Sequence, residues 1–142
     1  RGFPGSGRPM AGIEKVRALA RATQEKAHAP YSGFRVGAVL EADDGTLFSG
    51  CNVENASLGL TICAERSALA AAVAGGCRSF RRLVLVTDGD EAVPPCGACR
   101  AVLSEFSPDL QVLAEAGQSR KEWSLAELLP LPFRLRISRD DG

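Results

Sequence analysis

The sequence lacks the features of a membrane protein and of a protein that binds nucleic acid through its phosphates. In its 142 residues, no apolar run approaches the ~20 residues that cross a bilayer. Lysine plus arginine equals aspartate plus glutamate at 17 each, so the formal net charge is zero, whereas nucleic-acid-binding proteins usually carry a basic face. We therefore expect no membrane and no nucleic acid among the partners. A small, nearly neutral ligand fits the composition better.

A secretory signal and a disulfide framework are also missing from the sequence. Residues 1–9 contain no apolar stretch of the kind that a signal peptide needs. We interpret them as a flexible tail or a vector-derived remnant, followed by a single domain over 10–142 with Met10 as a plausible native start. The five cysteines are odd in number, which argues against a disulfide framework. Metal binding or catalysis in the cytoplasm is the favoured interpretation of these thiols.

The hydrophobic pattern predicts helices alternating with strands, and turn residues separate them. The expected elements, in chain order, are a helix over 13–26, strands over 34–40 and 46–51, a helix over 63–73, a strand over 83–86, a helix over 97–106, a strand over 110–113, and a weak edge strand passing into a short helix over 123–129. An opening hairpin followed by a βαβαβ pattern predicts an α/β fold, with a mixed sheet that carries helices on its faces.

Two cysteines lie three positions apart, at Cys96 and Cys99. On a helix this spacing brings the two side chains to the same face, roughly 5–6 Å apart at Cβ, so that both sulfur atoms can reach one metal ion. Pro94 and Pro95 fix the entry to that helix, and the unpaired N–H groups of a helix N-terminus favour thiolates. A single C-x-x-C motif is also compatible with a redox-active dithiol or with half of a structural zinc site.

A third cysteine, Cys63, begins the other predicted helix and is followed two positions later by Glu65. A structural zinc site needs four ligands, but the sequence has one histidine and no second C-x-x-C. Three thiolates leave the fourth position open, which is typical of catalytic zinc. Zinc lowers the pKa of bound water from about 15.7 toward 7, and a nearby carboxylate can carry the proton released. The simpler interpretation of Glu65 is an acidic residue favoured by a helix N-terminus.

Arg66 follows the glutamate directly. Three thiolates against one divalent ion leave a formal charge of about −1, which weakens zinc as a Lewis acid. A guanidinium that donates to a ligand sulfur atom draws charge away from it. We therefore predict that Arg66 hydrogen-bonds to a ligand sulfur atom without binding the metal itself. The alternative is that its side chain lies in solvent on the helix surface.

Several long motifs, in this order along the chain, resemble the small, homotetrameric, zinc-dependent cytidine deaminases. They are Pro30-Tyr31-Ser32-Gly33-Phe34-Arg35-Val36-Gly37-Ala38, Gly50-Cys51-Asn52-Val53-Glu54-Asn55-Ala56-Ser57, Cys63-Ala64-Glu65-Arg66, Pro95-Cys96-Gly97-Ala98-Cys99-Arg100 and Glu127-Leu128-Leu129-Pro130 with Phe133. The resemblance implies a three-layer α-β-α sandwich around a mixed, roughly five-stranded sheet. It also implies one Zn²⁺ per subunit, bound by three cysteines beside a catalytic glutamate, and a homotetramer whose sites neighbouring subunits complete.

The resemblance further implies the reaction and the substrate contacts. Cytidine and deoxycytidine would be hydrolysed to uridine and deoxyuridine with release of ammonia, as in pyrimidine salvage. Asn52 and Glu54 would hold the ribose hydroxyls, Phe34 would flank the pyrimidine, and the backbone near Ala64 would contact the base. Without the resemblance, Phe34 is a core residue, and turn chemistry accounts for Asn52 and Glu54.

Three features depart from the family pattern. The stretch Leu131-Pro132-Phe133 is shorter or altered in spacing, which leaves open whether Phe133 contacts the base across subunits. The family also usually has glutamine at position 101 and often an aromatic at position 58. This chain has Ala101 and Leu58. Two alternatives therefore stay open. One is a deaminase of a modified nucleoside or an aminonucleoside antibiotic, and the other is a non-catalytic zinc-binding module.

Overall fold

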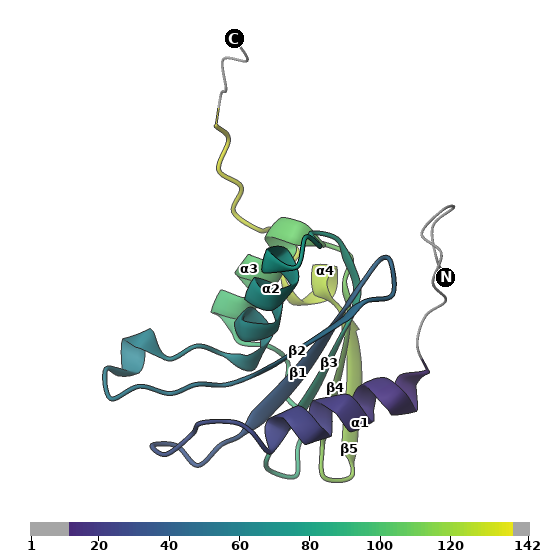
Figure 1. The fold of residues 1–142 in the computed structure, drawn as a ribbon. Coiled ribbons are helices and arrows are strands. Elements are labelled where there is room, and N and C mark those ends of the chain that lie inside the picture. The colour runs from purple at the N-terminus through teal and green to yellow at the C-terminus, as the bar shows by residue number, and fades with distance from the viewer. Residues whose placement is uncertain (1–11, 138–142) are drawn as a thin grey trace.

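The computed structural model describes residues 12–137, so the predicted tail over 1–9 lies outside the described residues. Within them the chain forms four α-helices, one short 3₁₀ helix and five strands (Figure 1). In chain order these are α1 (Ile13–Gln24), β1 (Val36–Ala42), β2 (Leu47–Cys51), η1 (Leu58–Leu60), α2 (Ala64–Ala74), β3 (Phe80–Thr87), α3 (Gly97–Phe106), β4 (Gln111–Ala116), β5 (Ser119–Ser124) and α4 (Leu125–Leu128). None of the helices over 12–137 is long and apolar enough to span a bilayer.

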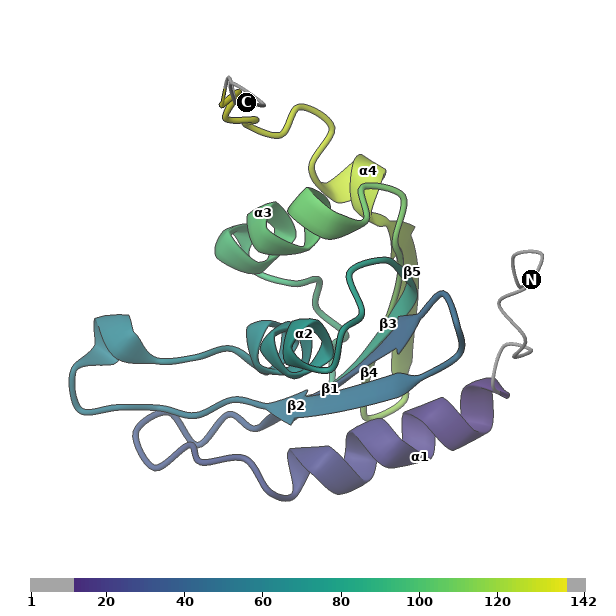
Figure 2. The same ribbon diagram turned by 45° about the horizontal axis from the view of Figure 1, so that its top comes forward.

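The strands form one mixed sheet in the order β2-β1-β3-β4-β5. β3 and β4 are parallel, because α3 carries the chain back across the sheet between them, and the other neighbouring pairs are antiparallel. Helix α1 covers one face, whereas α2 and α3 cover the other (Figure 2). The predicted three-layer α-β-α sandwich around a five-stranded sheet is confirmed.

Two glycines set the distance between the sheet and its helices. A Cβ atom at Gly37 of β1 would lie 2.1 Å from the backbone oxygen of Ala20 in α1. A Cβ atom at Gly50 of β2 would lie 2.4 Å from the backbone nitrogen of Ala68 in α2. Because no larger residue fits at either position, the helices pack close to the sheet on both faces. This close packing fixes where α2 begins, and with it the position of the site described below.

The structure differs from the predicted elements mainly at strand ends. β1 begins at Val36 rather than at position 34, so Phe34 lies in the preceding loop instead of in a strand. β3 is longer than the predicted 83–86, and β5 begins at Ser119, ahead of the predicted 123. β5 is largely exposed, and its run of charged residues lacks the alternation of apolar and polar residues that predicts a strand.

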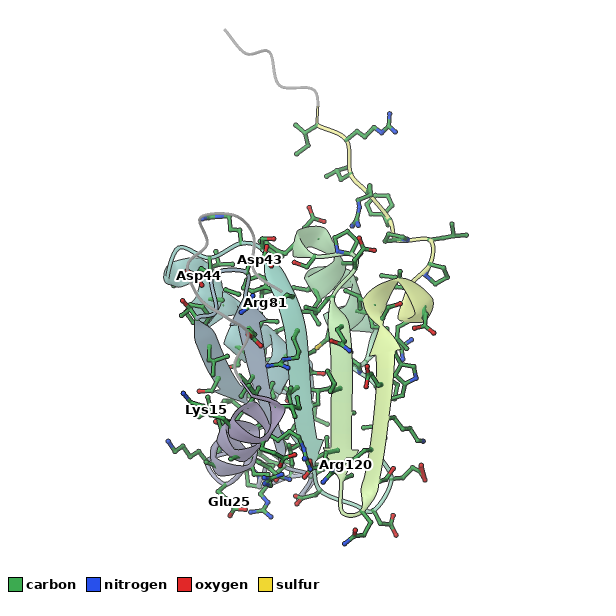
Figure 3. All side chains as sticks on the ribbon, turned by 90° about the vertical axis from the view of Figure 1, so that its right-hand side faces the viewer. Lys15, Glu25, Asp43, Asp44, Arg81 and Arg120 are labelled. Carbon is green, nitrogen blue, oxygen red and sulfur yellow. The ribbon has the colours of Figure 1, made fainter. Side chains whose placement is uncertain are left out.

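Charged residues lie at both ends of the sheet. Figure 3 shows Arg81 near Asp43 and Asp44 at one end, and Glu25 and Arg120 at the other. The first end contains the turn of the hairpin formed by β1 and β2. The second end is the one at which the helix N-termini of α2 and α3 and the loops around them form the candidate site.

Candidate metal centre and active site

Three cysteines from two helix N-termini converge on the same face of the sheet. Cys63 is the N-cap residue of α2, Cys96 is the N-cap residue of α3, and Cys99 lies one turn into α3. Their sulfur atoms all lie within 4.8 Å of one another, and those of Cys63 and Cys96 are 3.9 Å apart. The sequence spacing of Cys96 and Cys99 predicted their proximity, and the packing of α2 against the sheet brings Cys63 to them.

The donor set fits a zinc ion. A Zn–S distance of about 2.3 Å in tetrahedral geometry places ligand sulfur atoms roughly 3.8 Å apart, close to the separation of Cys63 and Cys96. Without a metal, burial raises the pKa of the Cys99 thiol, and the negative charges of Glu65 and Cys63 raise it further. A cation that binds this sulfur atom as a thiolate removes that penalty. Cys63, Cys96 and Cys99 can therefore hold a metal ion, with one tetrahedral position left for another ligand.

The guanidinium of Arg66 lies against these sulfur atoms. Its Nη2 donates to Cys63 Sγ at 3.4 Å, and the thiol of Cys99 also acts on the charge of the guanidinium. These contacts, led by the one to Cys63, raise the pKa of Arg66, so the positive charge is held firmly. The arrangement is the one expected for a group that withdraws charge from metal-bound thiolates.

Glu65 stands in the first turn of α2 and lines a cleft together with Cys63 and Cys96. It is 6% exposed and has no ion pair with any residue of 12–137. Burial raises the pKa of its carboxyl, and its own backbone N–H and Arg66 oppose that shift. A carboxyl group that is buried without an ion-pair partner beside a metal site is suited to taking up and releasing a proton.

The cleft has a volume of about 340 Å³ and joins the cysteines to the residues that the resemblance assigns to substrate. Phe34, Asn52, Glu54 and Ala64 all line it. They come from three separate segments of the chain, so the structure brings together what the sequence keeps apart. The Phe34 ring is 41% exposed, which fits a surface that receives a ligand better than a core position.

Asn52 and Glu54 each hydrogen-bond to the backbone of the cleft loops, and each keeps donors or acceptors that these bonds do not use. The Asn52 amide donates to the backbone oxygen of Phe34 and accepts from the backbone nitrogen of Val36, both at 2.8 Å. One amide N–H and one oxygen lone pair remain. Glu54 accepts from the backbone nitrogen atoms of Tyr31 and Ser32 at 2.9 and 3.1 Å. Both residues therefore shape the loops of the cleft and can still bind a ligand.

The sequence analysis missed several residues of the cleft. Ser32 lines it and bonds to Glu54, and Thr87 lines it from the end of β3. The motif Pro30-Tyr31-Ser32-Gly33 contained a signal for Ser32, but no spacing rule indicates that the end of β3 reaches the site. Two of the departures from the family pattern lie elsewhere: Ala101 lines a separate groove beside Phe133, and the Leu58 side chain is 68% exposed.

Comparisons with known proteins agree with this geometry. The family described as "Cytidine and deoxycytidylate deaminase zinc-binding region" matches residues 10–115. A cytidine deaminase of Sporosarcina psychrophila is 45% identical over 123 residues, which cover 85% of this chain and 90% of that protein. A cytidine deaminase structure from Burkholderia pseudomallei superimposes with a TM-score of 0.83 at 44% identity, covering 87% of this chain and 100% of that one.

A more distant relative bears on substrate. A blasticidin-S deaminase of Bacillus cereus is 33% identical over 106 residues, covering 69% of this chain and 76% of that protein. The match to the zinc-binding region spans most of the chain, and its cysteine cluster can hold the metal which that description names. This chain belongs to the cytidine and deoxycytidylate deaminase family.

Proposed function

We propose that this protein is a hydrolase that deaminates cytidine and deoxycytidine to uridine and deoxyuridine, with release of ammonia. One observation carries the proposal: three thiol groups lie within 4.8 Å of one another, and two of them, Cys63 and Cys96, line a cleft with a buried glutamate that has no ion pair among residues 12–137. The cytidine deaminases of S. psychrophila and B. pseudomallei support the substrate assignment.

Cys63, Cys96 and Cys99 would hold one zinc ion per chain, and Arg66 would reduce the charge on their sulfur atoms. When bound, zinc acts as a Lewis acid that lowers the pKa of a water molecule at its open position. The proton of this water has to be carried, and Glu65 is the buried carboxylate beside the sulfur atoms.

Glu65 is therefore the proton carrier of the reaction. It accepts a proton from water and passes it to N3 of the pyrimidine as oxygen adds to C4. It then takes the proton of the hydroxyl now on C4 and transfers it to the amino group as the C4–N bond breaks, so water and cytidine become uridine and ammonia. Glu65 is 6% exposed, which limits its direct contact with bulk water.

The other cleft residues orient the nucleoside. The Phe34 ring flanks the base, and the backbone at Ala64 contacts its edge. Asn52 and Glu54 bind the sugar hydroxyls through the donors and acceptors that their structural bonds leave unused. A neutral sugar and a neutral base suit a chain of zero net charge.

We further propose a cytoplasmic homotetramer that acts in pyrimidine salvage and whose sites neighbouring subunits complete. Large apolar side chains are exposed beside the cleft and on the C-terminal segment: Leu58 at 68%, Leu60 at 67% and Phe133 at 83%. Burial between subunits removes this apolar area from water. Light scattering tests the assembly, and a stable, fully active monomer would contradict it.

The second candidate substrate is an aminonucleoside antibiotic, which the B. cereus blasticidin-S deaminase raises. A panel of cytidine, deoxycytidine and blasticidin S, followed by absorbance, separates the two candidates. We expect the two nucleosides to have the highest kcat/KM. Preference for blasticidin S would reassign the substrate, and no turnover of any of the three, in protein that contains zinc, would favour a non-catalytic zinc-binding module.

A further inference from the structure

The hydroxyl of Ser32 connects two residues of the cleft and has no role in the proposed reaction so far. Its Oγ donates to Oε2 of Glu54 and accepts from the backbone nitrogen of Phe34 at 3.0 Å. Ser32 itself lines the cleft. The hydroxyl therefore links Glu54, which we assign to the sugar, to the backbone of Phe34, whose ring flanks the base.

The direction of both bonds follows from the atoms involved. A backbone N–H can only donate, so the N–H of Phe34 occupies a lone pair of the Ser32 oxygen. A hydroxyl has one hydrogen atom, and an ionised carboxylate can only accept it. The N–H of Phe34 thus holds the Ser32 hydroxyl with its hydrogen directed at Glu54.

These bonds leave Glu54 with a defined free acceptor. A carboxylate offers about four lone-pair sites. Oε1 accepts two backbone N–H groups, from Tyr31 at 2.9 Å and from Ser32 at 3.1 Å. Oε2 accepts the Ser32 hydroxyl, which leaves one acceptor site on Oε2. The bond from Ser32 is also the main reason why the pKa of Glu54 lies below its ordinary value.

We propose that Ser32 is a positioning residue, which aims the remaining acceptor site of Glu54 Oε2 at a sugar hydroxyl of the substrate. This inference rests on the proposed function, because it assumes a nucleoside in the cleft. It predicts that Ser32 acts on substrates only through their sugar hydroxyls.

The test compares Ser32→Ala with wild type on cytidine and on 2′,3′-dideoxycytidine, which lacks both hydroxyls at the far edge of the sugar. Loss of a hydrogen bond to a charged group should raise KM for cytidine roughly tenfold, with kcat changed less than threefold. For the dideoxy substrate, the KM of Ser32→Ala divided by the KM of wild type should stay near one. Equal losses on both substrates, or an unchanged KM for cytidine, would overturn the assignment.

Two further measurements separate positioning from a general loosening of the loop. The Ser32→Ala exchange should add little to the KM of Glu54→Gln, because both changes remove the same interaction. The proposal would be contradicted if Ser32→Ala raised KM by the same factor in the Glu54→Gln background as it does in wild type. The acidic rise in KM should begin at higher pH in Ser32→Ala, because the pKa of Glu54 is no longer lowered by the hydroxyl.

Control variants complete the design. Ser32→Thr keeps the hydroxyl and should restore most of the affinity. Ser49→Ala removes an exposed hydroxyl from β2, outside the cleft, and should leave KM unchanged. If wild type does not deaminate cytidine, the proposed function fails. If wild type is active but Ser32→Ala is unselective between the two substrates, only the role of Ser32 fails.

Discussion

Glu41 and Glu65 are both buried in the described part of the chain, but their electrostatic surroundings are opposite. Glu41 of β1 is fully buried and pairs with Arg81 at 2.9 Å and with Arg82 at 2.7 Å. Glu65 of α2 is 6% exposed and has no ion pair among residues 12–137. The first carboxylate is neutralised by two fixed cations, whereas the second is left free to exchange a proton. We therefore propose that Glu41 stabilises the fold and that Glu65 takes part in the reaction.

The two arginine environments extend this comparison. Arg81 and Arg82 donate to a carboxylate inside the fold, and their side chains are 9% and 7% exposed. Arg66 instead donates to the sulfur atom of Cys63, which can bind a metal ion. The same side-chain type thus neutralises a buried charge at one end of the sheet and lies against a possible metal ligand at the other, where we propose that it reduces the charge on that ligand.

The sharpest test of this comparison is Glu65→Gln, which keeps the shape and removes the proton carrier. We expect kcat to fall by about 10³-fold, because general acid–base catalysis supplies an effect of this order. Zinc content and unfolding midpoint should stay close to wild type, since Glu65 has no ion pair to break. Steady-state kinetics, metal analysis and thermal melting check these three results. Near wild-type turnover would remove Glu65 from the mechanism.

Glu41→Gln should have the reverse effect. It leaves two buried guanidinium groups facing a neutral amide, and breaking a buried ion pair in this way destabilises a protein by about 3–5 kcal/mol. Turnover per folded molecule should be unchanged, because Glu41 is outside the cleft. Urea unfolding measures the loss, with the exposed Glu122→Gln of β5 as the control. A stable Glu41→Gln protein with low turnover would invert the comparison.

Arg66→Gln tests whether the arginine near the sulfur atoms supports the metal. Loss of such a supporting hydrogen bond typically weakens metal affinity or activity by about 10- to 100-fold. Competition with a chromophoric chelator measures the zinc affinity. Wild-type affinity and wild-type kcat together would show that the Cys63 contact of Arg66 contributes nothing to the site.

The smallest effect is expected at Asp88, where hydrogen bonds from Arg35 lower the carboxyl pKa. A lowered folded-state pKa means that the stabilisation is present above the unfolded value and is lost as pH falls through the folded one. Because the Arg35 side chain is 41% exposed, Asp88→Asn should cost at most about 1 kcal/mol at pH 7. Unfolding of both proteins across pH 2–7 should show the difference disappearing at the acidic end.

Local spacing was sufficient to predict most of the metal centre. Cys96 and Cys99 lie one helical turn apart, and Cys63 and Glu65 begin a helix, so their chemistry is encoded within a few residues. The helices themselves were also predicted closely, because their apolar periodicity and terminal residues are strong signals. The strand order and the meeting of both helix N-termini depend on packing across the sheet, which one sequence does not display.

The substrate side of the cleft was less predictable. Asn52 and Glu54 were assigned only through the resemblance, since their residue types also suit turns. The contact of Ser32 with Glu54 joins residues 22 positions apart, and Thr87 reaches the cleft from the end of a strand that runs through the core. Contacts of this kind have no local pattern, so only the folded chain reveals them.

We propose that one metal ion on three cysteines, with Glu65 beside it, deaminates cytidine. The most direct measurement is the absorbance change of cytidine with the purified protein, after removal of metal by a chelator and after titration with zinc. We predict that activity disappears with the metal and returns in proportion to zinc, up to one ion per chain. Full activity in protein shown by elemental analysis to be free of metal would contradict the account.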